Sequence, residues 1–147
     1  MEKQTVPIKK LDKQAVVPTY GSEYSAGADL YACISEDMII GPGETRLVPT
    51  GIAMEIPVGY AGLVYARSGL ATKRGLAPAN KVGVIDSDYR GEILVSLHNH
   101  STEAQMVTSG ERIAQLVLTP VLAAQFCEVN ELLETQRGSG GFGSTGK

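Results

Sequence analysis

The chain has 147 residues, the length of one domain with a substantial buried core. Hydrophobic residues make up 43% and charged residues 20%, as in an ordinary globular protein, and no apolar run is long enough to span a membrane. The formal net charge of −3 argues against general affinity for nucleic acid, but it allows a small anionic substrate held by a few local cations.

The N-terminal residues 1–14 contain no apolar segment of the kind found in secretory signals. The two cysteines, Cys33 and Cys127, are far apart, and their spacing indicates neither a zinc site nor a disulfide framework. We interpret both as small core residues and expect a cytoplasmic protein, in which thiols stay reduced.

The region between residues 44 and 121 predicts short strands separated by turns. Residues 44–60 contain β-type stretches broken by three turn signals, and residues 112–121 indicate a buried strand ended by Pro120. In residues 92–100 the side chains would alternate between the two faces of a strand, and one face would carry the apolar residues Ile93, Val95 and Leu97. Short strands at close spacing favour an all-β sandwich or barrel.

Residues 68–75 are the one helix candidate, about two turns long and closed by Gly75 as a C-cap. If Ser68 caps this helix, its backbone N–H groups would attract an anion, although an ordinary helix cap is the common alternative. After about Glu134 the composition shifts to glycine and serine. We therefore expect a β domain over residues 1–133 and a flexible tail over residues 134–147.

Two segments combine charge with small residues. Asp29 is the carboxylate of "AGADL", residues 26–30, whose small neighbours let another molecule come near. "RSGLA", residues 67–71, places a cation, a hydroxyl group and bare backbone side by side. Either segment can have a purely structural role.

The segment "GVIDSDYRGE", residues 83–92, has the pattern of the tip of a β-hairpin. Asp86 follows directly on an apolar run, and a carboxylate at the edge of an apolar surface can act as a general base. Asp86, Asp88 and Gly91 can also be plain turn formers, which is the commoner use of these residue types.

Three polar residues lie in stretches that predict strands. Gln115, in "GERIAQL" (residues 110–116), would need a hydrogen-bonding partner in a buried strand. His98 and His100 share one strand face and could bind a metal, but no third ligand is near, so a role at the strand end is favoured.

The chain ends in "RGSGGFGSTGK", residues 137–147. Its lysine is the last residue and no strand precedes it, so the segment fails the context of a phosphate-binding P-loop. A disordered glycine-rich end is one interpretation. The other is a functional segment, because Phe142 could stack on a flat base and Arg137 could clamp a phosphate.

In this order and at these separations, the five quoted segments closely resemble the five motifs of the trimeric deoxyuridine triphosphatase (dUTPase) family, from Ala26 to Gly146. The resemblance implies a jelly-roll or distorted β-barrel fold and a homotrimer with active sites at subunit interfaces. It implies hydrolysis of dUTP to dUMP and pyrophosphate with Mg²⁺, which lowers dUTP and supplies dUMP for thymidylate synthesis. The glycine-rich tail would close over the active site of another subunit.

The resemblance also implies residue roles. Asp86 would be the general base for a water attacking the α-phosphorus. Tyr89 would lie under the deoxyribose and leave no room for a 2′-hydroxyl group. Asp29 would reach magnesium only through water, and the ion would be held mainly by the substrate phosphates.

The remaining implied residues bind substrate. Uracil would be read by Asn80 and by the backbone of Gly83, Val84 and Ile85. The phosphates would be held by Arg67, Ser68, Gly69 and Gln115. From the tail, Phe142 would stack on uracil beside Gly143, and the phosphates would also contact Arg137 and Ser144.

Two other functions stay open at this point. One is a dCTP deaminase, a related enzyme that carries a glutamate where this chain has Ser96. The other is a non-catalytic nucleotide-sensing or regulatory module on the same fold. The presence of Asp86 together with Tyr89, Arg137 and Phe142 favours catalysis, because binding alone needs no base.

Overall fold

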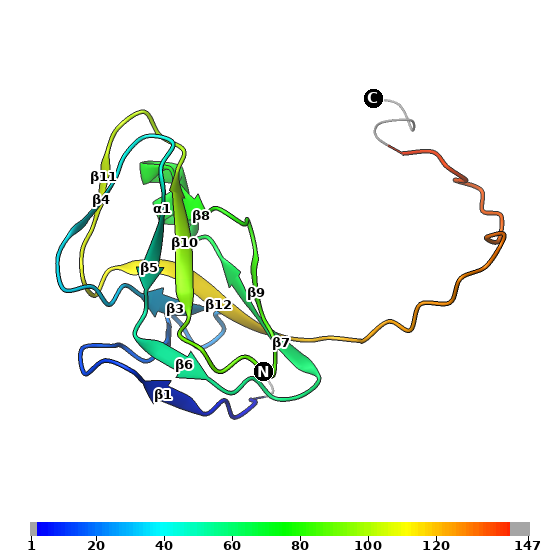
Figure 1. Cartoon of the computed structure of the whole chain (residues 1–147), viewed down its shortest axis with the longest axis horizontal. Coiled ribbons are helices and arrows are strands. Elements are labelled where there is room, and N and C mark those ends of the chain that lie inside the picture. Colours follow the sequence, from blue (N-terminus) through cyan, green and yellow to red (C-terminus); the bar gives the residue numbers. More distant parts are fainter. Residues whose placement is uncertain (1–2, 142–147) are drawn as a thin grey trace.

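The computed structural model describes residues 3–141 of the chain. This part is built almost entirely of β-strands, with one short helix, as the sequence predicts (Figure 1). The elements, in chain order, are β1 (Ile8–Lys10), β2 (Thr19–Tyr20), β3 (Ala28–Tyr31), β4 (Met38–Ile40), β5 (Thr45–Pro49), β6 (Ile52–Met54), β7 (Tyr60–Tyr65), α1 (Ser68–Arg74), β8 (Leu76–Pro78), β9 (Gly83–Ile85), β10 (Leu94–Asn99), β11 (Gln105–Val107) and β12 (Arg112–Pro120).

Two antiparallel sheets position the residues of interest. The larger has the order β2-β3-β12-β7-β9, and the smaller has the order β5-β10-β8. The pairs β1-β6 and β4-β11 complete the jelly-roll arrangement. Because β12 lies at the centre of the larger sheet, its Gln115 stands opposite Asp29 of β3 on one side and Tyr65 of β7 on the other.

The core lies between these strands and consists of aliphatic side chains. The alternation predicted for residues 92–100 is confirmed, because Ile93, Val95 and Leu97 are buried while the alternate side chains are not. The predicted strand ending at Pro120 is confirmed as well. The largest fully buried aliphatic side chains are Leu30, Ile40, Ile52, Leu76, Leu97 and Ile113.

The predicted helix is present, and Gly75 closes it in the left-handed conformation, with φ of 65°. The prediction that Ser68 is the N-cap is wrong. The N-cap is Arg67, whose backbone is extended and whose side chain makes no capping hydrogen bond, and Ser68 is the first helical residue. The backbone is still extended at Arg67 and turns helical at Ser68, so the helix begins one residue earlier than a Ser68 cap would require.

The prediction of a β-hairpin tip at residues 83–92 is also wrong. Strand β9 pairs with β7, whereas β10 pairs with β5 and β8. Residues 86–93 therefore cross from the larger sheet to the smaller one. Apolar and turn-forming residues indicate where strands start and stop, but they do not indicate which neighbour each strand pairs with.

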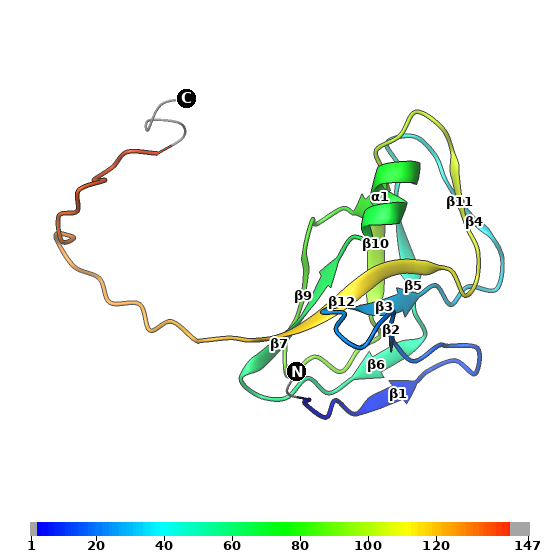
Figure 2. The same cartoon turned by 180° about the vertical axis from the view of Figure 1, so that it is seen from behind.

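The chain leaves the folded part after Pro120, earlier than the composition change near Glu134 suggests. Figures 1 and 2 show the following segment extending away from the sheets, and every residue over 121–139 is exposed. Cys127 lies in this segment and is exposed, so its interpretation as a core thiol is wrong. Within residues 3–141, no helix has the length and hydrophobicity needed to cross a membrane.

Candidate active site

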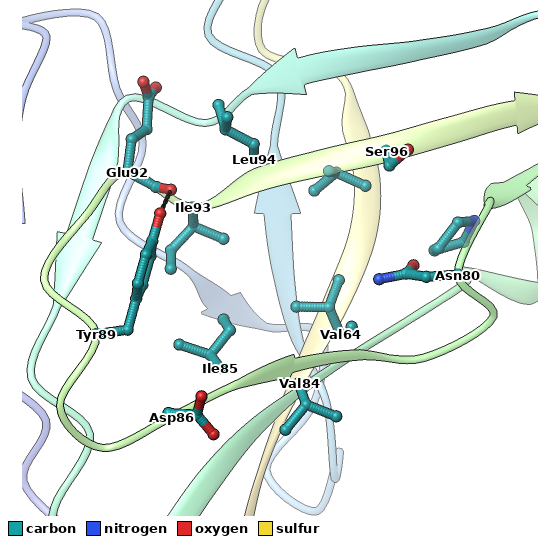
Figure 3. A pocket seen from close by; sticks show the side chains of 13 residues that line it. Val64, Asn80, Val84, Ile85, Asp86, Tyr89, Glu92, Ile93, Leu94 and Ser96 are labelled. Atoms are coloured by element: carbon teal, nitrogen blue, oxygen red, sulfur yellow. Dashed lines mark hydrogen bonds between the residues drawn. The ribbon is translucent and has the colours of Figure 1, made fainter.

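The sequence-predicted site residues line two separate pockets. The first, here called the β9–β10 pocket, lies between β9 with its following loop and the start of β10 (Figure 3). It is lined by Val64, Pro78, Asn80, Gly83, Val84, Ile85, Asp86, Tyr89, Glu92, Ile93, Leu94, Val95 and Ser96. Most of these side chains are apolar, so a flat, weakly polar group is the kind of ligand that the pocket suits.

Backbone and amide groups supply the polarity of the β9–β10 pocket. Strand β9 is at the edge of the larger sheet, so one side of its backbone faces no further strand of the described chain. The turn before it holds Asn80, whose carbonyl accepts a hydrogen bond from Val82 N at 2.7 Å. The Asn80 amide points into the pocket near Val64 (Figure 3). An amide and a free strand edge can together hydrogen-bond the edge of a planar heterocycle.

Asp86 lies at the mouth of this pocket, directly after β9. Its side chain is exposed, and it makes no hydrogen bond or ion pair with any residue over 3–141. The neighbouring Ile85 is buried in the core, which fixes the backbone from which the carboxylate projects. Asp86 is thus an unpartnered carboxylate on a fixed support, as a general base requires.

Tyr89 forms one wall of the pocket and is 45% exposed. Its hydroxyl group donates a hydrogen bond to the carbonyl oxygen of Glu92 at 2.9 Å (Figure 3). Its backbone N–H donates to Asp86 O at 3.2 Å. The loop therefore fixes the aromatic ring and the free carboxylate relative to each other.

The second pocket, here called the Asp29 pocket, lies where β3, β12 and the start of α1 meet. It is lined by Gly21, Ser25, Ala26, Gly27, Asp29, Arg67, Ser68, Gly69, Arg112 and Gln115. Gln115 donates from Nε2 to the carbonyl oxygen of Ala66 at 2.9 Å, which meets the sequence-based expectation of a partner for this amide.

Asp29 is the centre of the charge arrangement in this pocket. It is 9% exposed, and its Oδ1 accepts a hydrogen bond from Arg67 Nε at 2.7 Å. Its Oδ2 accepts a longer one from Arg112 Nη1 at 3.3 Å. One carboxylate thus orients two guanidinium groups, and the pocket retains an excess of positive charge. Such a site suits a phosphate group.

One chain does not bring all of the predicted residues together. Asp86 and Tyr89 line the first pocket, Arg67 and Gln115 line the second, and the two pockets share no lining residue. Arg137 lies on the exposed tail, where its Nε donates to the carbonyl oxygen of Gly140 at 2.8 Å. The other predicted tail residues, Phe142, Gly143 and Ser144, lie outside the described residues.

Sequence reasoning missed two residues. Arg112 pairs with Asp29. One indication of this is present in the sequence, because a charged residue at the start of a mostly buried strand needs a partner of opposite charge. Glu92 accepts a hydrogen bond from the backbone N–H of Gly51, a contact that spans 41 positions and leaves no local pattern.

Burial raises the pKa of the nearby Cys33 thiol, and the carboxylates of Asp12 and Glu92 add to this effect.

The two histidines lie together but apart from both pockets. Their ring centroids are 4.4 Å apart, and His98 Nδ1 shares a 2.8 Å hydrogen bond with Thr45 Oγ1 on the neighbouring strand. Burial, His98 and Lys81 all lower the pKa of His100. This contact across strands supports the structural interpretation of the pair.

Comparisons with known proteins agree on one family. Residues 13–146 match the family model described as dUTPase. A deoxyuridine 5'-triphosphate nucleotidohydrolase from Nautilia profundicola is 54% identical over 140 residues, which cover 95% of this chain and 97% of the relative.

Solved structures give the same result. A point mutant of the Staphylococcus bacteriophage 80alpha dUTPase with dUpNHpp aligns with a TM-score of 0.85 and 28% identity, covering 99% of this chain and all of that one. A point mutant of the dUTPase of S. aureus phage phi11, described with a structural Mg(II) ion, aligns with a TM-score of 0.77 and 25% identity, covering 87% of this chain and 98% of that one.

Proposed function

The chain belongs to the dUTPase family and hydrolyses dUTP to dUMP and pyrophosphate, and we propose that it does so at sites assembled from several copies of the chain. The observation that carries the proposal is the separation of the site into two pockets without a common residue. One copy supplies the β9–β10 pocket, and a second supplies the Asp29 pocket. A homotrimer with three such sites is the assembly we propose.

The exposed segment after Pro120 supports assembly. It carries large apolar side chains that are exposed within the described residues 3–141, among them Leu122, Phe126, Leu132 and Leu133. An apolar surface of this kind gains free energy when it is buried against a partner. We propose that this segment runs over a neighbouring subunit and delivers Arg137 to that subunit's site.

The β9–β10 pocket is the proposed site for uracil and deoxyribose. Asn80 and the free edge of β9 would hydrogen-bond the uracil edge. A close-fitting pocket excludes the 5-methyl group of thymine. It rejects cytosine because the hydrogen-bonding polarity at the 4-position is reversed, which leaves buried polar groups unpaired. Tyr89 would lie against the sugar and exclude a 2′-hydroxyl group.

The Asp29 pocket of a second copy is the proposed phosphate site. Asp29 orients Arg67 and Arg112, and a guanidinium held in place loses little freedom when it binds a phosphate. Gln115 would contribute its side-chain amide. At the start of α1, Ser68 would contribute its hydroxyl group and backbone N–H, and Gly69 would contribute its backbone N–H.

Magnesium fits this donor set. No cluster of three metal-binding side chains occurs among residues 3–141, and Mg²⁺ commonly binds through one carboxylate, several waters and substrate phosphates. Asp29 would hold the ion through water, since both of its oxygens already accept hydrogen bonds from arginine. When bound, the ion neutralises phosphate charge.

The proposed reaction is an in-line displacement at the α-phosphorus. Asp86 accepts a proton from a water molecule as that water's oxygen bonds to the α-phosphorus. The bond from the α-phosphorus to the bridging oxygen breaks, and pyrophosphate leaves. Reactions of this type depend mainly on positioning and charge neutralisation, which Arg67 and Arg137 would supply together.

The two alternatives find less support. Ser96 lines the β9–β10 pocket where a deaminase would present a carboxylate, and the matched relatives are dUTPases. A purely regulatory module would not need the unpartnered carboxylate of Asp86. We place the reaction in the cytoplasm, because both cysteines are free thiols.

A pyrophosphate-release assay with dUTP, UTP, dTTP and dCTP, with and without Mg²⁺, tests the proposed specificity and the metal requirement. We expect rapid release only from dUTP and only with the metal. Ammonia released from dCTP would support the deaminase instead. Equal turnover of dUTP and dTTP would contradict the proposed base pocket.

We expect Tyr89→Ala to lower the preference for dUTP over UTP by about 10- to 100-fold, because the ring no longer occupies the space of a 2′-hydroxyl group. The measurement is kcat/KM for both nucleotides. Tyr89→Phe keeps the ring but loses its hydrogen bond to the Glu92 carbonyl oxygen, so its preference should lie between those of Tyr89→Ala and the wild type. An unchanged preference in Tyr89→Ala would show that the sugar is recognised elsewhere.

A further inference from the structure

The loop that carries Tyr89 is attached to the turn between β5 and β6. Gly51 N donates to Glu92 Oε1 at 2.9 Å, and Ile93 N donates to Ile52 O at 2.9 Å. Thr50 donates to Ile93 O from Oγ1 at 2.6 Å and from its backbone N at 3.3 Å. Four hydrogen bonds thus hold residues 92 and 93 on this turn.

The turn is a firm support because it is buried. Thr50 is 1% exposed and Ile52 is 1% exposed. Gly51 has φ of 67°, and a β-carbon there would lie 2.8 Å from both Ala15 Cβ and Cys33 Sγ. The N–H of Gly51 therefore has a fixed direction, and the Glu92 side chain that accepts from it is fixed as well.

Tyr89 rests on the residues held by this turn. Its hydroxyl group donates to the Glu92 carbonyl oxygen, while the Glu92 side chain points away from the ring (Figure 3). The ring lies against the α-carbon of Gly91, where a β-carbon would lie 2.6 Å from Cζ of Tyr89. That distance is well inside van der Waals contact, so the ring can occupy this position only when residue 91 has no side chain.

The position of this ring matters because it is not otherwise constrained. Tyr89 is 45% exposed, and a half-exposed aromatic side chain can change rotamer at little cost unless something holds it. A ribose differs from a deoxyribose by one oxygen atom. A small displacement of the ring would therefore make room for the 2′-hydroxyl group.

We propose that Gly91 and Glu92 are positioning residues that set the selectivity for deoxyribose. Gly91 provides the bare surface on which the Tyr89 ring lies. Glu92 ties that surface to the β5–β6 turn through its side chain and holds the Tyr89 hydroxyl group through its carbonyl. The inference rests on the proposed function, in which Tyr89 lies against the sugar of the substrate.

The test is the ratio of kcat/KM for dUTP to kcat/KM for UTP in the full-length protein. Glu92→Ala and Gly91→Ala should each lower this ratio about tenfold or more, mainly through faster turnover of UTP. Glu92→Gln should keep the ratio within about threefold of the wild type, because its Oε1 can still accept from Gly51 N–H.

Glu55→Ala is the matched control. Glu55 pairs with Arg90 of the same loop at 3.4 Å, and both side chains are more than half exposed. Loss of this surface pair should leave the ratio unchanged. A general loosening of the protein would lower kcat/KM for both nucleotides and leave the ratio unchanged, so the ratio separates positioning from stability.

The outcomes distinguish this inference from the function on which it rests. The inference is overturned if Tyr89→Ala loses the preference for dUTP while Glu92→Ala and Gly91→Ala keep it. If Tyr89→Ala keeps the preference, the proposed role of Tyr89 fails and the inference fails with it. Should Glu92→Ala not fold, Gly91→Ala gives the same test, because it leaves the hydrogen bonds to the turn in place.

Discussion

Asp86→Asn is expected to lower kcat for dUTP by about 10³-fold while nucleotide binding stays close to that of the wild type. An amide has nearly the same shape as a carboxylate, but it cannot accept a proton from the attacking water. The Asp86 side chain is exposed and makes no hydrogen bond or ion pair within residues 3–141, so the substitution should not change stability. Steady-state kinetics and titration with a non-hydrolysable dUTP analogue measure the two quantities separately.

Asp88→Asn is the control for this variant. Asp88 is an exposed carboxylate of the same loop, but it does not line the β9–β10 pocket. Its loss should leave kcat within about twofold of the wild type, since it would act only through weak surface electrostatics. Wild-type turnover by Asp86→Asn would remove this residue from the role of general base.

Deletion of residues 137–147 is expected to leave a folded, assembled protein whose kcat is lower by about 100-fold or more. The deletion removes Arg137 and the rest of the glycine-rich tail. It keeps the sheets and the apolar segment after Pro120 that we propose to lie on a neighbouring subunit. The missing segment would otherwise neutralise phosphate charge and exclude water from the site.

Size-exclusion chromatography with light scattering checks the assembly of the truncated protein, and steady-state kinetics give its turnover. The full-length Arg137→Ala variant removes the guanidinium charge but keeps the tail that would exclude water from the site. We expect its kcat to lie between those of the wild type and the truncated protein. Unimpaired turnover by the truncated protein would rule out a catalytic role for the tail.

Much of the fold can be predicted from local sequence. The alternation at residues 92–100, the stop at Pro120 and the C-cap at Gly75 each depend on a few neighbouring residues, and all three are present. The pairing of β9 with β7 could not be predicted in the same way. Strand partners are chosen by packing between distant segments, and both β9 and β10 have sequences that suit several neighbours.

The candidate site, like the fold, could be predicted from the sequence only in part. The order of the five motifs identifies Asp86, Tyr89, Asp29, Arg67 and Gln115 as residues of interest. It does not show that they line two pockets, because that separation is a property of the whole fold. The contact of Glu92 with Gly51 joins positions 41 apart, and the single chain gives no local signal for it.

The most direct test of the shared site is to mix two variants that are inactive by themselves. Asp86→Asn has an intact Asp29 pocket, and Arg67→Ala has an intact β9–β10 pocket. Co-expressed with different affinity tags and isolated as mixed trimers, they should recover activity, because about one site in three of each mixed trimer receives both intact pockets. Mixed trimers no more active than the two parents would show that each site lies within one chain, and would contradict the account.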